Sequence, residues 1–218
     1  MFLFVLLCIL SYVVGSLPSA YIVGTLLKVD LSQVGSRNIG ASNITFNCGI
    51  RWAIPVIIFD IILKGCFPVW FGLAILGIEY NSWLIALPAF ASISGHNWSC
   101  FLKFKGGRGI LVTIGILIIT TPLIFLLSSI IFILGWLFFR NTAVWVLYAL
   151  CSVLIWSFII PSPILIPIVC IILIVIKRLI PDLEPLPTEM SKKRIYFNRL
   201  LNDRDIADRT LWISRIST

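Results

Sequence analysis

Charged residues are scarce in this chain of 218 residues. Asp, Glu, Lys and Arg together make up 12% of it, whereas hydrophobic residues make up 60%. Soluble domains carry about a quarter charged residues and about half apolar ones, so a soluble globular domain is excluded. Each membrane span needs roughly 20 apolar residues to cross about 30 Å of hydrocarbon. We therefore expect an all-α integral membrane protein.

The side chains and motifs of metal, disulfide and nucleotide sites are also lacking. The chain has one histidine, His96, and six scattered cysteines without a Cys-x-x-Cys pair. This pattern supports neither a zinc site nor a disulfide framework. No G-x-x-x-x-G-K-S/T run occurs, and no G-x-G-x-x-G follows a strand. We expect no metal and no cofactor.

A carboxylate is missing where one common acyltransferase mechanism needs it. Many glycerolipid acyltransferases use a His-x-x-x-x-Asp dyad, in which the carboxylate assists the imidazole. The only histidine here is His96, and Phe101 stands five residues after it. That dyad is therefore excluded.

What the chain does contain is long apolar runs, at about residues 2–27, 52–78, 82–102, 110–139 and 142–176. The first three have the length of one span each, while the last two are too long for one span and short for two. Thr121-Pro122 and Pro161-Ser162-Pro163 are plausible breaks, because proline removes a helix hydrogen bond. Splitting both runs predicts a polytopic bundle of about seven transmembrane helices, and leaving both whole predicts five.

The placement of charge predicts the topology. Basic residues gather in the loops at 28–51 and 103–109, whereas Glu79 lies in the loop between them along the chain. Excess Lys and Arg mark the cytoplasmic side, so the N-terminus is expected outside and the C-terminus in the cytoplasm. Splitting both long runs leaves Arg140 inside, whereas leaving both whole places it outside. The net charge of +8 then reflects topology and attraction to anionic lipid, and no nucleic acid is expected.

The two ends of the chain need separate interpretation. Residues 1–27 carry no charge and are too long for a signal-peptide core, which predicts a retained first span. Residues 1–180 form the expected multi-span domain, and residues 181–218 a cytoplasmic linker and tail. Apolar residues recur there at helical intervals, which fits a surface-lying amphipathic helix or an ordinary charged tail: Ile195, Leu200, Leu201, Ile206, Leu211 and Trp212.

Two loops on the expected cytoplasmic face have the composition of an anion site. Residues 35–43 read GSRNIGASN and residues 95–109 read GHNWSCFLKFKGGRG. Glycine-rich backbone can bring N–H groups close to an anion, and Ser and Asn can bind hydroxyls. Ordinary turns and topology-fixing charges remain the alternative interpretation. Asp60 and Lys64, four apart in the second run, would share a helix face and could pair.

These segments carry a family resemblance. GSRNIGASN is similar to the motif GSGNxGATN, and residues 95–109 are similar to GHxFPxFLxFKGGKG. Residues 15–24 match GSxPSxYxxG, and residues 176–184 echo IKRLxxGxE. Asp60, Lys64, Gly65 and Pro68 match the residues of DxxKGxxP, with one more residue between Asp60 and Lys64. Over about residues 15–184 the chain thus resembles the bacterial acyl-phosphate:glycerol-3-phosphate acyltransferases, the PlsY family.

The resemblance implies a fold, a reaction and a set of site residues. Such enzymes have seven helices in the bacterial cytoplasmic membrane and an active site open to the cytoplasm. They transfer a fatty acyl group from acyl phosphate to the 1-hydroxyl of glycerol-3-phosphate, without acyl-CoA or a metal, and give lysophosphatidic acid. The implied catalytic residues are Ser36, His96, Lys105 and Arg108. The implied substrate-binding residues are Asn38, Asn43, Lys64, Gly106, Gly107 and Gly109. Arg37 is added to them as a candidate from this sequence alone.

Several departures from the family pattern fall on these motifs. Arg37 replaces a glycine, Phe46 replaces the arginine that ends the first motif, and Arg108 replaces a lysine. Ala143 and Val146 stand where a pair of serines is expected. Three functions therefore stay open: an active acyltransferase, an impaired paralogue that binds or regulates phospholipid metabolism, and a small-anion transporter. The oligomeric state is not predicted.

Overall fold

A computed structural model describes residues 1–180 and 190–208 of the chain, and the described part is helical. The first half contains α1 (Phe2–Ser16), α2 (Ser19–Leu26), α3 (Ala41–Cys48), α4 (Ile50–Phe59), the π-helix η1 (Asp60–Cys66) and α5 (Phe67–Ala74). The second half contains η2 (Trp83–Ile85), α6 (Ala86–Asn97), η3 (Cys100–Leu102), α7 (Ile110–Thr120), α8 (Pro122–Phe139), α9 (Thr142–Ile159), α10 (Leu165–Leu179) and α11 (Lys192–Asn202). The expectation of an all-α fold is confirmed.

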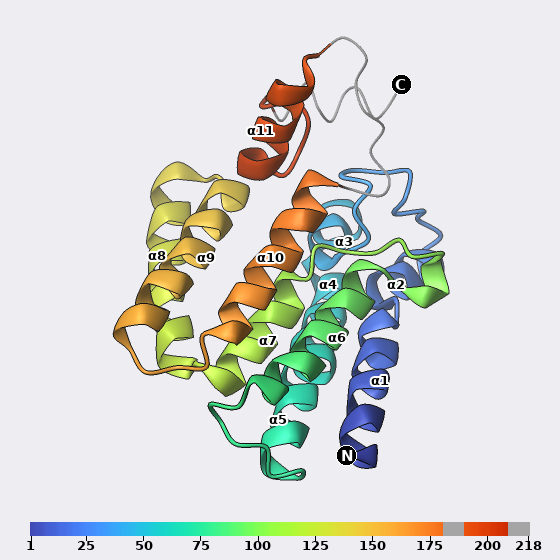
Figure 1. Ribbon diagram of the computed structural model, residues 1–218. Coiled ribbons are helices and arrows are strands. Elements are labelled where there is room, and N and C mark those ends of the chain that lie inside the picture. The colour runs from blue at the N-terminus through green and yellow to red at the C-terminus, as the bar shows by residue number, and fades with distance from the viewer. Residues whose placement is uncertain (181–189, 209–218) are drawn as a thin grey trace.

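The long helices of the bundle coincide with the apolar runs of the sequence (Figure 1). Within the described residues, four helical segments are long and apolar enough to cross a membrane: Phe2–Leu26, Ile50–Ala74, Pro122–Phe139 and Thr142–Ile159. The two ambiguous runs are each divided where proline was expected to break them. Pro122 begins α8 after Thr121, and residues 160–164 separate α9 from α10. The split of both runs is thus confirmed, although the number of spans is a separate question.

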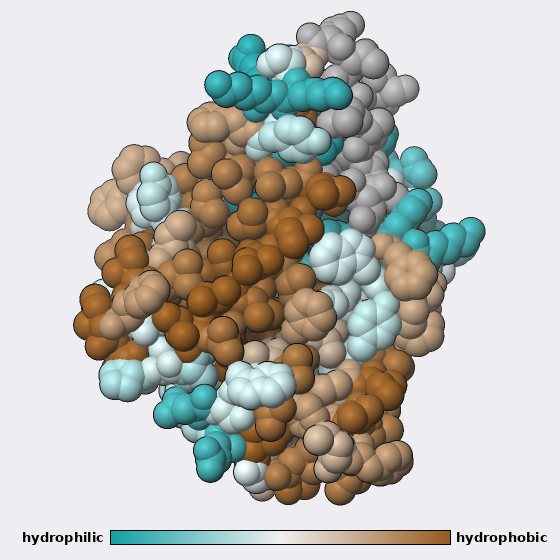
Figure 2. Space-filling model, in the orientation of Figure 1, coloured by the Kyte–Doolittle hydropathy of each residue, from teal (hydrophilic) through white to brown (hydrophobic). Residues whose placement is uncertain are grey.

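The basic loops of the sequence lie at the same end of the bundle (Figure 1). The loop before α3, the loop before α7, the α8–α9 turn and α11 all lie at that end. The α5–α6 loop and the N-terminus lie at the other end. Between them, Figure 2 shows a broad apolar surface with hydrophilic residues above and below it. This banding is what a lipid-facing bundle requires, because apolar side chains there replace contacts with water.

Glycines let the central rods approach closely. A Cβ atom on Gly15 of α1 would collide with the backbone of Ser92 in α6, and one on Gly95 would collide with the Tyr12 carbonyl. Gly65 of η1 and Gly115 of α7 face one another in the same way, 2.7 Å from a Gly65 Cβ to the Gly115 Cα. Only glycine permits such contact. The α1–α6 and η1–α7 contacts therefore hold these helices, and the buried polar residues on them, at fixed positions relative to one another.

The core lies between α5, α6, α7 and α10. Val69, Ile93, Ile116 and Ile166 are fully buried there and form one apolar cluster. At the end of α7, the Tyr80 hydroxyl of the α5–α6 loop donates to the Thr120 carbonyl, and burial raises the pKa of this phenol. The loop is thereby tied to the α7–α8 break.

The C-terminal segment docks at the basic end. Helix α11 packs against α9 and α10. The Nη1 atom of Arg178 donates to the Leu200 carbonyl over 2.9 Å, and Nη1 of Arg199 donates to the Leu179 carbonyl over 3.1 Å. The helix ends at Asn202, so it covers part of the expected amphipathic stretch. Residues 181–189 of the linker and the expected apolar positions Leu211 and Trp212 lie outside the described residues.

Candidate active site

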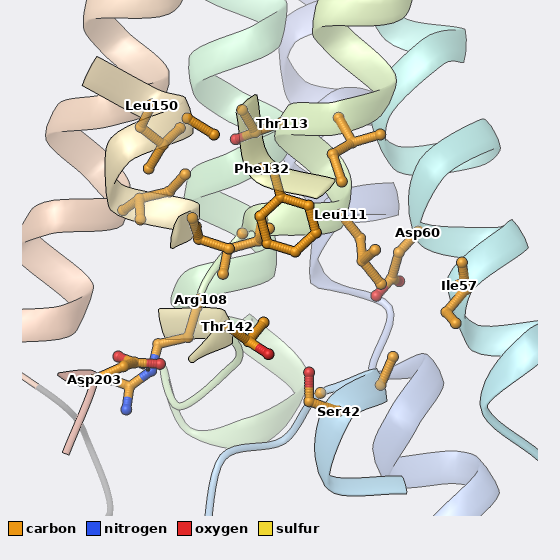
Figure 3. Close-up of a pocket in the computed structure, with 18 of the residues that line it drawn as sticks. Ser42, Ile57, Asp60, Arg108, Leu111, Thr113, Phe132, Thr142, Leu150 and Asp203 are labelled. Carbon is orange, nitrogen blue, oxygen red and sulfur yellow. Dashed lines mark ion pairs between the residues drawn. The ribbon is translucent and has the colours of Figure 1, made fainter. Parts of the chain in front are cut away.

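A cavity of about 470 Å³ lies at the basic end, between the 36–45 segment, α7, α8 and α9. Its mouth is polar and is lined by Ser36, Asn38, His96, Arg108 and Asp203. Figure 3 shows Arg108 and Asp203 next to each other there. Deeper in, apolar side chains of α7, α8 and α9 line it: Leu117, Phe125, Phe132, Leu150 and Val153. The cavity therefore joins a polar, partly cationic mouth to an apolar interior. A ligand that fits it would carry both a charged group and a hydrocarbon chain.

The first loop is shaped around Asn43. Its Nδ2 atom donates to the carbonyls of Leu31, Val34 and Asn38, each over 3.1 Å. Its Oδ1 atom accepts from the Ser36 N–H over 3.3 Å. The amide of Asn43 is thus used by the loop itself, and Asn43 is not among the residues that line the cavity. The loop in turn presents Ser36 and Asn38 to the cavity.

Ser36 has a hydroxyl that can still donate. Its Oγ atom accepts from the Asn38 N–H over 3.3 Å, which leaves the O–H group to bind an acceptor in the cavity. Arg37, at a φ of 53°, turns the chain between these two residues. Arg37 does not line the cavity, and Phe46 on α3 is 57% exposed. Neither position therefore places a cation in the cavity.

A buried ionic network lies beside the mouth. Lys64 Nζ is 2.7 Å from Asp60 Oδ1, and the Ser19 hydroxyl donates to the same oxygen over 2.8 Å. His96 Nδ1 is 3.4 Å from Lys64 Nζ and 3.8 Å from Asp60 Oδ2. The expected pairing of Asp60 with Lys64 is confirmed. Within the described residues Asp60 Oδ2 accepts no hydrogen bond, although Asp60 lines the cavity.

The second loop folds back on the end of α6. Ser99 donates its hydroxyl to the Ser16 carbonyl over 2.5 Å, and the Gly107 N–H donates to the His96 carbonyl over 3.1 Å. A Cβ on Gly106 would collide with the backbone of His96 and Asn97, and one on Gly107 with the His96 ring. These two glycines are therefore required for close packing, a role that the sequence interpretation of an N–H cradle missed. Gly109, at a φ of 75°, is the N-cap residue directly before α7.

The basic residues of this loop have different surroundings. Lys105 is exposed and is not among the residues that line the cavity, whereas Arg108 is 6% exposed and lines it. Arg108 donates from Nη1 to the Lys177 carbonyl over 2.7 Å, and its Nε lies 3.1 Å from Asp203 Oδ1. Of the two, Arg108 has the placement that an anion at the cavity mouth would need.

Other lining residues were not foreseen. Ser42, Thr45, Thr113, Thr142 and Asp203 all contribute to the cavity wall. Ser42 belongs to the first motif and Thr45 stands two residues after its end, so their position was a usable signal. Thr142 lies one residue before Ala143, at the place where the sequence lacked the expected serine pair. Asp203 carried no such signal, because only the docking of α11 brings it to Arg108.

Fold and site together define a polytopic α-helical membrane protein whose apolar cavity opens on a polar, cationic mouth at one end of the bundle. The glycerol-3-phosphate acyltransferase family matches this chain over residues 5–185. The chain belongs to that family.

Individual relatives agree with this assignment. A glycerol-3-phosphate acyltransferase 5 of Dehalococcoides mccartyi is 33% identical and covers 98% of this chain and 94% of its own. The glycerol-3-phosphate acyltransferase of Aquifex aeolicus is 30% identical over 72% of this chain and 81% of its own.

Two solved structures share the fold. The crystal structure of PlsY (YgiH) in its glycerol 3-phosphate form has a TM-score of 0.74 and 28% identity, covering 80% of this chain and 88% of that one. Its lysophosphatidic acid form has a TM-score of 0.74 and 26% identity, covering 97% of this chain and 98% of that one.

Proposed function

We propose that this protein transfers a fatty acyl group from acyl phosphate to the 1-hydroxyl of glycerol-3-phosphate and so produces lysophosphatidic acid for phospholipid synthesis. The observation that carries this proposal is the two-part cavity, in which Ser36, Asn38 and Arg108 stand at the mouth of an apolar interior. Both substrates bear phosphate and one bears a hydrocarbon chain. Membership of the family and the likeness to PlsY support the same reaction.

The acyl chain of the donor would lie in the apolar part of the cavity. The whole cavity has a volume of about 470 Å³, which is in the range of sites that bury most of a small ligand. Each methylene group moved from water into such a space contributes about 0.8 kcal/mol. The chain therefore anchors the donor, and its phosphate is left at the mouth beside Arg108.

The phosphate of the donor is the group assigned to Arg108. Arg108 is buried and lines the cavity, and α7 begins two residues after it at Ile110. A helix N-terminus adds partial positive charge for an anion. Negative charge grows on this phosphate as the acyl carbon–oxygen bond breaks, so the two groups stabilise the leaving group.

Ser36 and Asn38 are assigned to glycerol-3-phosphate. A hydroxyl and an amide can hold the glycerol hydroxyls and phosphate oxygens at hydrogen-bond distance. The acceptor oxygen attacks the acyl carbon, the bond to the donor phosphate breaks, and the hydroxyl proton passes to a phosphate oxygen. Acyl phosphate is already activated, so juxtaposition of the two substrates supplies much of the catalysis. This scheme uses no protein nucleophile, metal or cofactor.

The remaining predicted site residues are given supporting roles in this scheme. His96 and Lys64 belong to the buried network beside the mouth and hold the end of α6 against η1. Gly106, Gly107 and Gly109 let the second loop pass close to α6, and Asn43 holds the first loop in shape. Lys105 and Arg37 lie outside the lining and would attract anionic substrates towards the mouth.

The same proposal includes the cellular setting. The protein is a multi-pass membrane protein, and we place it in the bacterial cytoplasmic membrane with about seven spans. The basic end, which holds both loops and α11 (Figure 1), would face the cytoplasm. That orientation leaves the N-terminus outside and the tail inside, with residues 1–180 as the membrane domain and 181–218 as the tail.

The test is an assay of the full-length protein in lipid nanodiscs with acyl phosphate and radiolabelled glycerol-3-phosphate. We expect labelled lysophosphatidic acid from acyl phosphate and none from acyl-CoA. A cooperative unfolding transition shows that the protein is folded. If such protein makes no product with any acyl phosphate tried, the proposal is overturned.

A second candidate is an impaired paralogue that binds phospholipid precursors without turning them over. The observation in its favour is Phe46, which stands 57% exposed where the family has an arginine. Growth of a bacterium that lacks its own glycerol-3-phosphate acyltransferase decides between the two, because only an active enzyme restores it.

A further inference from the structure

The C-terminal segment brings a carboxylate into the site described above. Asp203 Oδ1 lies 3.1 Å from Arg108 Nε and 4.0 Å from Arg178 Nε. Asp203 also lines the same cavity as Ser36 and Asn38 (Figure 3). The Asp203 carboxylate thus lies beside the Arg108 guanidinium, the group that we assign to a substrate phosphate.

The position of this carboxylate is fixed by the end of α11. Asp203 caps the helix with a φ of 56°, and its N–H donates to the Arg199 carbonyl over 3.0 Å. Aspartate adopts this left-handed conformation more readily than most residues. The chain turn that ends the helix therefore delivers the side chain to the cavity mouth.

Contacts other than the Asp203 side chain also hold the segment in place. Arg178 holds the Leu200 carbonyl, Arg199 holds the Leu179 carbonyl, and Arg199 pairs with the buried Asp205. Asp203 is 24% exposed, and within the described residues its Oδ1 atom accepts no hydrogen bond. The contact with Arg108 is therefore one of charge alone. A rotation of the Asp203 side chain could break it while α11 stays in place.

We propose that Asp203 is a tethered competitor for the phosphate group that binds Arg108, so that the C-terminal segment sets the affinity of the site for phosphate. The proposal rests on the function proposed above. A phosphate has more oxygens and more charge than a carboxylate, so it can displace Asp203. The carboxylate and the phosphate repel one another, so both cannot occupy the same side of Arg108 at close range.

The size of the effect follows from competition. Phosphate binds only to the fraction of molecules in which Asp203 does not occupy Arg108. The apparent dissociation constant for phosphate is the intrinsic one divided by this fraction. For a partly exposed ion pair we expect a factor of about 2 to 6. Asp203→Asn should therefore tighten binding by that factor, because the amide carries no charge.

The test compares full-length wild type with Asp203→Asn, Asp203→Glu and Glu79→Gln in nanodiscs. Glu79 is exposed in the α5–α6 loop at the other end of the bundle, so Glu79→Gln removes the same charge away from the site. The probe is inorganic phosphate, with its dissociation constant obtained from the shift of the thermal unfolding transition. We expect tighter binding in Asp203→Asn, near wild-type binding in Glu79→Gln, and an intermediate or wild-type value in Asp203→Glu.

Kinetics give a second measurement. Asp203→Asn should lower the KM for acyl phosphate about 2- to 6-fold and leave the KM for glycerol-3-phosphate nearly unchanged. Should Asp203→Asn fold poorly, Asp203→Ser removes the same charge with a smaller side chain. Phosphate binding that is unchanged or weaker in the neutral variants, or tightened equally by Glu79→Gln, overturns the inference. If wild type makes no lysophosphatidic acid, the proposed function fails, and the phosphate measurement still decides the role of Asp203.

Discussion

Lys64 and Asp60 form an ion pair inside the bundle, with 2.7 Å between Nζ and Oδ1 and side-chain exposures of 2% and 1%. Both belong to η1, and the Ser19 hydroxyl ties them to α2 by donating to the same carboxylate oxygen. Ionisable groups at such depth persist because each compensates the other. The pair therefore links η1 to α2 directly beside the cavity.

Removal of one partner should destabilise the protein strongly. Asp60→Asn leaves the Lys64 charge buried without its counterion, at a cost of about 3–5 kcal/mol. The double variant Asp60→Leu, Lys64→Met replaces both charges by apolar groups of similar size and should recover much of the lost stability. Unfolding temperatures in detergent, followed by fluorescence, check this. A double variant as unstable as Asp60→Asn would show that the pair is not the cause.

The glycines of the second loop should differ in their tolerance of a side chain. A Cβ on Gly106 meets rigid backbone, including the Asn97 carbonyl oxygen at 2.7 Å, whereas one on Gly107 meets the His96 ring. A ring can rotate and backbone cannot. Gly106→Ala should therefore lose more acyltransferase activity and stability than Gly107→Ala.

Gly77 supplies the control for this series. Unlike Gly106 and Gly107 it has a positive φ, of 63°, and a Cβ there meets nothing within 4 Å. Gly77→Ala should cost only the left-handed backbone penalty of about 1–2 kcal/mol and leave activity intact. Equal effects of the three substitutions on activity would contradict a specific packing role for the second loop.

Much of this architecture was readable in the sequence where proline and charge dominate locally. Pro122 and the Pro161–Pro163 turn were expected to divide the long apolar runs, and they do, because proline removes a helix hydrogen bond and favours a helix start or a break. Proline alone does not decide this, since Pro55 lies inside α4. The Asp60–Lys64 pairing was predictable for a similar reason, since residues four apart share a helix face.

Other features were not predictable because they depend on tertiary contact. The π-helix at Asp60–Cys66 has no local sequence signature, and the glycines of the second loop were interpreted as an anion cradle rather than as packing residues. Lys105 and Arg108 looked equivalent in KFKGGRG, yet one is exposed and the other lines the cavity. Asp203 reaches that cavity only through the docking of α11.

Arg108 and Lys105 can be separated by mutation. If the cavity marks the active site, Arg108→Ala removes a charge that stabilises the departing phosphate and should lower kcat/KM for acyl phosphate about 10²-fold. Lys105→Ala, which affects an exposed cation, should reduce it by less than about 10-fold, and this loss should shrink at high salt. Initial rates at two ionic strengths check both. A larger loss at Lys105 would contradict the placement of the phosphate at Arg108.

The geometry of Arg108 gives a companion variant. Arg108→Lys keeps the charge but cannot reproduce the planar donor set that now reaches the Lys177 carbonyl and Asp203. It should fall between wild type and Arg108→Ala. Wild-type activity in Arg108→Lys would mean that charge alone is needed at this position.

The depth of the cavity should set the acyl-chain preference. Ala149 of α9 lines its interior, so Ala149→Phe fills space that the end of a long chain would use. Each methylene that can no longer be buried costs about 0.8 kcal/mol, or roughly fourfold in kcat/KM. The ratio of kcat/KM for palmitoyl phosphate to that for lauroyl phosphate should therefore fall by at least about 10-fold. Ile155→Phe is the matched control, because Ile155 lies on the same helix and is 59% exposed. A ratio that changes equally in both variants, or in neither, would show that the chain binds elsewhere.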